Sequence, residues 1–189
     1  MNQTESIKIS LKNYNNHGYN PGKGFMVRAL WYLVNIFFFL NPLCISIGFK
    51  VFLLKLFGGR VGKGVVIKPR VNIKYPWNIE IGDHVWIGEK VWIDSLGPVK
   101  IENNVCISQG AILVCGNHDY TKSTFDLMIS EIHLEEGVWI GVGAIAGPGT
   151  HAQNHSVLTA GSVASGKLEP YSIYRGNPAI LNKQRRISE

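Results

Sequence analysis

The sequence is poor in cysteine and in charge for its length. Its 189 residues include three cysteines (Cys44, Cys106 and Cys115), and 17% of its residues are charged. An odd number of cysteines without metal-type spacing argues against a disulfide framework and fits a reducing cytoplasm. Residues 1–25 are polar and contain no apolar stretch that ends in a small-residue cleavage site, so we expect no secretory signal.

Acidic residues are nearly absent from the N-terminal part. Residues 1–75 hold eleven Lys or Arg and one acid, Glu5, whereas residues 76–189 hold eight Lys or Arg and twelve acids. This asymmetry predicts that the N-terminal part faces something anionic. The cations flank an uncharged stretch, residues 29–49, which includes Trp31 and the three successive phenylalanines 37–39. Cations around aromatic apolar residues favour a membrane surface over nucleic acid.

The uncharged stretch leaves three alternatives open. Its twenty-one residues are enough to span a bilayer, but Pro42 ends a helix near Asn41. The stretch therefore forms two short helices that cap the rest of the chain, an interfacial anchor on a membrane, or a true span. Either short-helix alternative would also cover an otherwise open, pairing-prone end of the fold that follows.

The region from Val61 to Ala164 lacks the 3.6-residue period of an amphipathic helix and the two-residue period of a strand. It repeats every six residues instead. An aliphatic or small residue recurs at Val61, Ile67, Ile73, Ile79, Ile81, Ile87, Ile93, Val99, Ile101, Ile107, Leu113, Leu134, Ile140, Ala146, Ala152, Leu158 and Ala164. A second small or β-branched residue follows most of these four positions later, as at Val65, Val85 and Ser162.

A period of six is typical of a hexapeptide parallel β-helix, an all-β solenoid in which three repeats form one triangular coil. The aliphatic position then points into the prism, and Gly, Asn and Asp occupy the corners. We therefore expect three parts. Residues 1–60 form a polar arm and an apolar helical segment, residues 61–168 form the β-helix, and residues 169–189 form a C-terminal tail.

The repeat stops after Leu113 and resumes at Leu134, which predicts a loop at residues 114–133. Loops inserted in solenoids commonly carry the binding face. His118 lies where the chain leaves the coil, and an imidazole is suited to take a proton from a hydroxyl at neutral pH. Asn117 and Asp119 flank it and are candidates to orient it or to hold an acceptor. Cys115 leaves a Cys–His acyl-enzyme open as a rival.

Several segments carry a resemblance to a known family. These are Cys115–Tyr120 (CGNHDY), Gly137–Gly141 (GVWIG), Ala160–Val163 (AGSV) and Arg175–Ala179 (RGNPA). Together with the repeat they resemble the hexapeptide-repeat O-acetyltransferases, which include the galactoside and maltose acetyltransferases. The subgroup of colanic acid and exopolysaccharide biosynthesis is closer, because it shares the segments at residues 30–35 (LWYLVN) and 74–78 (KYPWN). The resemblance covers residues 25–181.

The resemblance implies a left-handed β-helix, a homotrimer and acetyl-CoA as co-substrate in a cleft between subunits. It implies that His118 acts as general base on the hydroxyl of a sugar or lipid-linked glycan, without a metal. It places acetyl-CoA against Gly141, Val142, Ala160 and Gly161. Ser165 and Lys167 match the polar or basic pair of the family with a spacing that differs by one residue, and Trp139 either lines the cofactor tunnel or is an exposed aromatic of the coil face. Many relatives have a basic residue for the nucleotide phosphates where this chain has Ile180, so Lys183, Arg185 or Arg186 is expected to substitute.

On the acceptor side, Asp94 lies near a coil break and is a candidate to hold a sugar hydroxyl. The leading interpretation is a cytoplasmic O-acetyltransferase, with peripheral contact at the inner face of the membrane as an extension of it. Three alternatives remain open: N-acetylation of an amino sugar, a zinc enzyme like the γ-class carbonic anhydrases, and a non-catalytic solenoid. The zinc enzyme needs three histidines that converge between two subunits.

Overall fold

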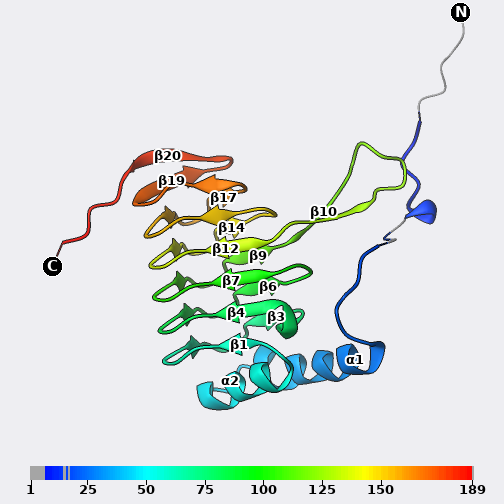
Figure 1. The fold of residues 1–189 in the computed structure, drawn as a ribbon, viewed down its shortest axis with the longest axis horizontal. Coiled ribbons are helices and arrows are strands. Elements are labelled where there is room, and N and C mark those ends of the chain that lie inside the picture. Colours follow the sequence, from blue (N-terminus) through cyan, green and yellow to red (C-terminus); the bar gives the residue numbers. More distant parts are fainter. Residues whose placement is uncertain (1–6, 15, 17, 189) are drawn as a thin grey trace, which may run out of the picture.

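The computed structural model describes residues 7–14, 16 and 18–188, and it is a triangular solenoid with three parallel sheets (Figure 1). Sheet A contains β1 (Arg60–Val61), β4 (Ile79–Ile81), β7 (Val99–Ile101), β12 (Ile132–Leu134), β15 (His151–Ala152) and β18 (Lys167–Leu168). Sheet B contains β2 (Val66–Ile67), β5 (Trp86–Ile87), β8 (Cys106–Ile107), β13 (Trp139–Ile140), β16 (Val157–Leu158), β19 (Ser172–Gly176) and β20 (Ala179–Gln184). Sheet C contains β3 (Asn72–Ile73), β6 (Trp92–Asp94), β9 (Ile112–Val114), β14 (Ile145–Ala146) and β17 (Val163–Ala164).

The predicted six-residue ladder is the core of the solenoid. Each strand pairs in parallel with the strand of the same side in the next coil, so Ile81 lies beside Ile101 and Ile101 beside Leu134. Every aliphatic or small position of the repeat is buried, as are Val65, Val85 and Ser162 of the second set. The repeat prediction is confirmed. Three repeats take the chain once around the triangle, so each aliphatic side chain lies between equivalent side chains of the coils above and below.

The N-terminal segment caps the first coil. It contains a short 3-10 turn (Leu11–Asn13), then α1 (Phe25–Val34), which continues into the π-helical turn η2 (Asn35–Leu40), and finally α2 (Ile47–Leu56). Helical structure stops before Pro42, as predicted. The Trp31 indole N–H donates to the carbonyl of Ile73 at 2.9 Å, and the Asn35 amide donates to the side-chain oxygen of Asn72 at 2.7 Å. These bonds fix the helices against β3.

Within the described part of the chain, no helix has the length and apolar character needed to cross a membrane.

The solenoid extends beyond the boundary expected at residue 168. β19 pairs in parallel with β16, and β20 turns back to pair antiparallel with β19. Residues 172–184 are therefore the last layer of sheet B, and the expectation of a tail over residues 169–189 is wrong for this part. The repeat is hard to recognise here because β20 reverses direction, which changes the spacing.

Close stacking of coils sets a steric limit at Gly88, which follows β5. A Cβ atom at this position would lie 2.7 Å from the backbone nitrogen of Gln109 in the next coil. The backbone of that coil is held by the ladder: the Gly88 N–H donates to the carbonyl of Ile107 at 2.8 Å. An added methyl group could therefore be accepted only if the coils moved apart.

We predict that Gly88→Ala lowers the free energy of unfolding by about 1–3 kcal/mol, the usual cost of overpacking. Gly48→Ala is the matched control, because Gly48 lies in α2 and a Cβ there has no heavy atom within 4 Å. Urea denaturation followed by circular dichroism measures both. Equal midpoints for the two variants would contradict the stacking argument.

Candidate active site

The loop that interrupts the repeat is a two-stranded ribbon that projects from the solenoid (Figure 1). β10 (Gly116–His118) leaves the corner between sheets C and A, and β11 (Leu127–Ile129) returns antiparallel to it, with His118 opposite Leu127. The polar N-terminal arm runs beside the ribbon, and the Ser10 N–H donates to the Ser123 carbonyl at 2.8 Å. Ribbon and arm together build a partly enclosed surface around His118.

The His118 imidazole is held in one tautomer. Its Nδ1 lies 3.1 Å from the backbone carbonyl oxygen of Phe125, and its ring stacks on the Phe125 ring at 4.4 Å. Tyr14 of the arm meets the imidazole edge-on at 5.7 Å. Because a carbonyl oxygen only accepts, Nδ1 carries the hydrogen and Nε2 keeps the lone pair. In this tautomer Nε2 is the atom that can accept a proton.

The residues that flank His118 organise the loop rather than the imidazole. The Asn117 side-chain oxygen accepts the backbone N–H of His118 at 2.8 Å. The Asp119 carboxylate accepts the backbone N–H of Thr121 at 3.0 Å and its hydroxyl at 2.5 Å. These hydrogen bonds, and to a smaller extent the nearby Lys122, lower the pKa of Asp119. Asp119 is therefore an ionised group that closes the turn at the ribbon tip.

A cavity of about 820 Å³ lies between the ribbon and the arm. The arm contributes mostly polar residues to the cavity lining, and the ribbon contributes carboxylates. The lining includes Asn16, Tyr19, Asn20, Asn78, Leu96, Asp119, Lys122, Asp126 and Leu127. Two lining residues are neighbours of His118: Leu127 is its cross-strand partner, and Asp119 is the next residue in the chain. The cavity thus adjoins the strand pair that carries the imidazole.

Asp94 lies at the root of the ribbon, on β6. Its side chain is largely buried, and its only ion-pair partner among the described residues is Lys74, 3.3 Å from Oδ1. That oxygen has no hydrogen-bond partner in the described part of the chain. Gly116, where β10 begins, is close, since a Cβ there would lie 3.9 Å from Asp94 Oδ2. Asp94 is therefore a largely buried carboxylate at the root of the ribbon, with the Lys74 ammonium as its counter-charge.

Sequence reasoning did not find Phe125 or Tyr19. Phe125 acts through its backbone carbonyl, which has no residue-type pattern. Tyr19 donates its hydroxyl to the Leu96 carbonyl at 3.2 Å and lines the cavity. Burial, followed by the neighbouring Tyr75 and Asp94, raises the pKa of Tyr19, so it stays a neutral donor. A tyrosine inside an Asn- and Gly-rich arm was the available signal.

The residues assigned to acetyl-CoA fall into two groups on opposite edges of sheet C. The first lies at the corner between sheets B and C. There the Gly161 N–H donates to the Val142 carbonyl at 2.8 Å, and a Cβ on Gly141 would lie 2.5 Å from the nitrogen of Ala160. Trp139 is nearby on the outer side of β13, 45% exposed, with its indole N–H donating to Ser108 at 2.9 Å.

The second group lies at the corner between sheets C and A. Ser165 follows β17 there, and Lys167 is on β18 in sheet A, where it pairs with Glu169 at 3.2 Å. This is the corner from which the His118 ribbon leaves two coils away. Lys183 belongs with neither group, because it lies on β20 opposite Ile173, towards the corner between sheets A and B. Within a single chain, the residues that the resemblance assigns to acetyl-CoA therefore lie apart from one another.

Cys115 is a packed thiol. It is fully buried, its Sγ lies 3.7 Å from the Gly97 carbonyl oxygen, and burial raises its pKa to about 11. A thiol in this environment stays protonated at neutral pH and is a poor nucleophile. The geometry therefore gives no support to a Cys–His acyl-enzyme.

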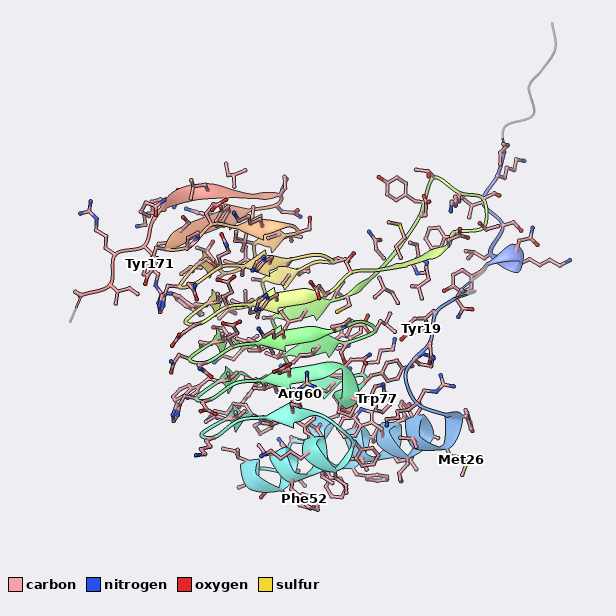
Figure 2. The ribbon with its side chains drawn as sticks, in the orientation of Figure 1. Tyr19, Met26, Phe52, Arg60, Trp77 and Tyr171 are labelled. Carbon is pink, nitrogen blue, oxygen red and sulfur yellow. The ribbon has the colours of Figure 1, made fainter. Side chains whose placement is uncertain are left out.

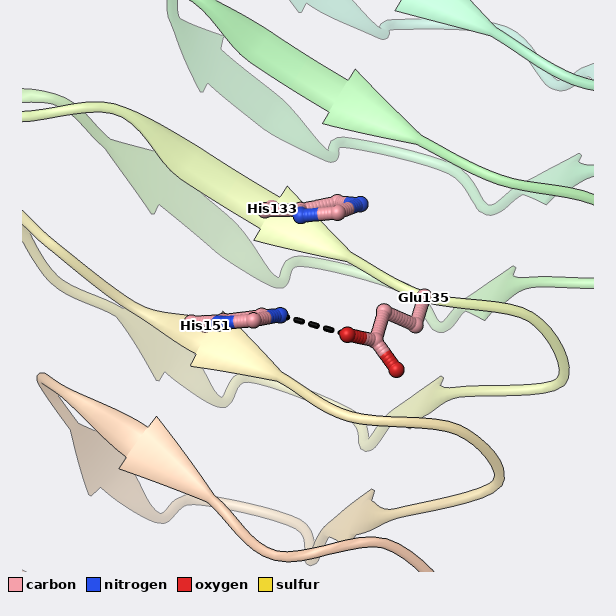
Figure 3. Close-up of side chains that lie close together, drawn as sticks. All are labelled: His133, Glu135 and His151. Atoms are coloured by element: carbon pink, nitrogen blue, oxygen red, sulfur yellow. Dashed lines mark hydrogen bonds and ion pairs between the residues drawn. The ribbon is translucent and has the colours of Figure 1, made fainter.

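A separate cluster of imidazoles and a carboxylate lies on the outer side of sheet A (Figure 3). His133 and His151 stack at 4.9 Å, and ligand atoms of these two and of Glu135 lie within 4.8 Å of one another. Each imidazole already bonds a carboxylate: His133 to Glu102 at 2.8 Å and His151 to Glu135 at 2.6 Å. Among the described residues of this chain, no third histidine joins the cluster.

Comparisons with known proteins agree with this architecture. The chain is 33% identical over 168 residues to the colanic acid biosynthesis acetyltransferase WcaF of Escherichia coli, covering 89% of this chain and 92% of WcaF. It is 28% identical to the galactoside O-acetyltransferase of Escherichia coli, over 70% of this chain and 66% of the relative. No protein-family model matches the sequence.

Among solved structures, the hexapeptide-repeat acetyltransferase VCA0836 of Vibrio cholerae, complexed with acetyl-coenzyme A, superposes with a TM-score of 0.78. The identity is 20%, and the match covers 95% of this chain and all of that one. At this identity the match speaks for the fold, which is the left-handed β-helix. The identity and coverage shared with WcaF establish the family: this chain belongs to the hexapeptide-repeat acetyltransferases.

Proposed function

We propose that this protein transfers the acetyl group of acetyl-CoA to a hydroxyl of a sugar or polysaccharide precursor, with His118 as general base. The observation that carries the proposal is the hydrogen bond from His118 Nδ1 to the Phe125 carbonyl, which leaves Nε2 as the basic atom. Family membership supplies the reaction class, and the cavity beside the ribbon supplies a place for the acceptor.

The reaction needs few groups. The acceptor oxygen attacks the carbonyl carbon of the thioester while its proton passes to His118 Nε2. The tetrahedral intermediate collapses as the carbon–sulfur bond breaks, and the proton returns to the leaving sulfur. A positioned base contributes about 10²–10⁴-fold to such a step. No nucleophilic side chain takes part, in accordance with the buried, protonated Cys115.

The acceptor class follows from the cavity and from the relatives. The cavity presents amide and carboxylate groups, which hydrogen-bond hydroxyls well. Asp94 adds a carboxylate at the root of the ribbon, paired with Lys74. WcaF is named for colanic acid biosynthesis, and the other relative is a galactoside O-acetyltransferase. These features favour a sugar hydroxyl over an amine, although a base of this kind serves both acceptors.

The same geometry favours a site shared between copies. The Trp139 corner and the Ser165 corner lie at opposite edges of sheet C, and the His118 ribbon projects beyond its own solenoid. Two copies placed side by side would bring the first corner of one next to the ribbon corner of the other. In a closed ring of three copies, every chain would make both of these contacts with its neighbours.

The proposed reaction is tested by following thiol release from acetyl-CoA with a panel of nucleotide sugars, free sugars and lipid-linked glycans, each beside its amino-sugar analogue. We expect release with a hydroxyl acceptor and an acetyl ester in the product. Release only with amino sugars would replace O-acetylation by N-acetylation, and no release with any acceptor would refute the proposal.

His118→Gln is expected to lower kcat by about 10²–10⁴-fold with little change in the affinity for acetyl-CoA, because it removes only proton transfer. His84→Asn is the control. His84 lies at a corner with φ 56°, a conformation that asparagine tolerates. A loss of less than about tenfold at saturating acceptor would exclude His118 as the base.

Asp94→Asn is expected to raise the KM for the acceptor by about 10-fold or more, since a charged hydrogen bond to the ligand contributes roughly 1.5–3 kcal/mol. Glu80→Gln serves as control, because Glu80 pairs with exposed Arg60 on sheet A. Steady-state kinetics with varied acceptor distinguish the two. An unchanged KM for the acceptor would remove Asp94 from the binding site.

We expect a trimeric mass by light scattering at micromolar concentration. Mixing His118→Gln subunits with Trp139→Ala subunits should restore part of the activity, since some sites then combine both intact halves. Restoration must be absent when either variant is mixed with itself. A monomeric mass, or no restoration after verified subunit exchange, would show that each chain holds a complete site.

A further inference from the structure

The capping helices bury only one of their two sides. Trp31, Phe39, Leu53 and Leu54 pack into the core beneath the first coil. We call α1, η2 and α2 together, with the connection between η2 and α2, the helical base. In Figure 1 the helices of the base lie across the end of the stack, and β20 closes the opposite end. Capping therefore explains the inner side of the base and leaves the outer side unexplained.

The outer side of the helical base is apolar and exposed. Figure 2 shows Met26 and Phe52 on the side of the helices that faces away from the coils. Large hydrophobic side chains are exposed along the whole base, at Phe25, Met26, Val27, Leu30, Tyr32, Leu33, Phe37, Leu40, Leu43, Ile45, Phe49, Phe52 and Leu56. Leu43 is 84% exposed and Ile45 75% exposed. So many exposed apolar side chains on one short segment are unusual on a free surface and indicate a partner.

Exposed cations border the helical base, and the base itself contains no acid. Lys23 precedes α1, Lys55 lies in the last turn of α2, and Lys63, Lys68 and Arg70 lie on the first coil. All five are exposed, and none takes part in an ion pair among the residues that the structure describes. The sequence contains no Asp or Glu from residue 6 to residue 79. The occupant of the face should therefore combine an apolar interior with anionic groups at its edge.

A second copy of this chain does not meet that requirement. A symmetric contact would place the same cations of both copies opposite each other, with no acid on the helical base to compensate. Nucleic acid supplies the phosphates but no apolar phase for the leucines and phenylalanines. An anionic bilayer supplies both, since acyl chains accept apolar side chains and headgroups attract lysine and arginine at the level of the interface.

We propose that the helical base is a docking surface for an anionic membrane, with α1 and α2 lying flat in the interface. The solenoid then stands away from the bilayer. The arm that leads into α1 lines the cavity through Tyr19 and Asn20, so docking would hold the acceptor cavity near lipid-linked substrates. Only this last consequence rests on the proposed function; membrane binding itself does not depend on acetyl transfer.

Vesicle co-sedimentation of the full-length protein tests the proposal. We expect binding to mixed phosphatidylglycerol–phosphatidylcholine vesicles, weaker binding as salt is raised, and little binding to phosphatidylcholine alone. The variants Phe37→Ser/Phe52→Ser and Lys55→Gln/Lys68→Gln should each lower the partition coefficient at least about tenfold. All four side chains are exposed, so circular dichroism spectra should match the unsubstituted protein.

The controls are Leu181→Ser and Arg186→Gln, exposed positions at the opposite end of the solenoid, which should leave vesicle binding unchanged. Absence of binding to anionic vesicles at low salt would overturn the proposal. So would binding that survives both double variants. If Phe37→Ser/Phe52→Ser instead lowers the mass of the protein in light scattering, the face is an interface between copies. None of these binding experiments uses acetyl-CoA. A protein that binds membranes but lacks activity would therefore refute only the proposed reaction.

Discussion

The backbone hydrogen bonds between successive coils are the interaction on which this structure depends. They run along all three sheets and place each residue above its equivalent in the previous coil, as with Trp86, Cys106 and Trp139 in sheet B. This stacking buries the aliphatic ladder without a second layer. It also leaves almost no freedom to individual coils, which is why the chain can depart from the pattern only at a corner.

That constraint decides where chemistry can occur. The ribbon of β10 and β11 leaves one corner and returns to it. The stack therefore continues past the insertion, with β14 paired to β9 and β12 paired to β7. The ribbon is free to position His118 outside the solenoid, while Phe125 within the same ribbon fixes the imidazole. In the proposed reaction, the rigid stack would hold the ligand and the projecting ribbon would supply the base.

A solenoid also has two ends, and this chain closes them differently. At the C-terminal end β20 folds back on β19, and the Arg185 guanidinium donates to the carbonyls of Gly137 and His155 at 3.0 Å each. At the N-terminal end helices replace strands, and their inner side completes the core while their outer side stays apolar. The C-terminal end is covered by the chain itself, whereas the outer side of the helices at the N-terminal end is an exposed apolar surface.

The sequence by itself determined the solenoid and the break at residues 114–133, and it singled out His118 as the candidate base. A six-residue period has one structural explanation, and a break in it stands out. It also indicated two short helices, because Pro42 cannot continue a helix. The tertiary structure alone decided that Phe125 fixes the imidazole, that Asp119 closes a turn, that Cys115 is buried, and that Trp139 and Ser165 lie at opposite corners. These facts depend on backbone carbonyls, on burial and on which corner each coil presents, and none of them has a residue pattern along the chain.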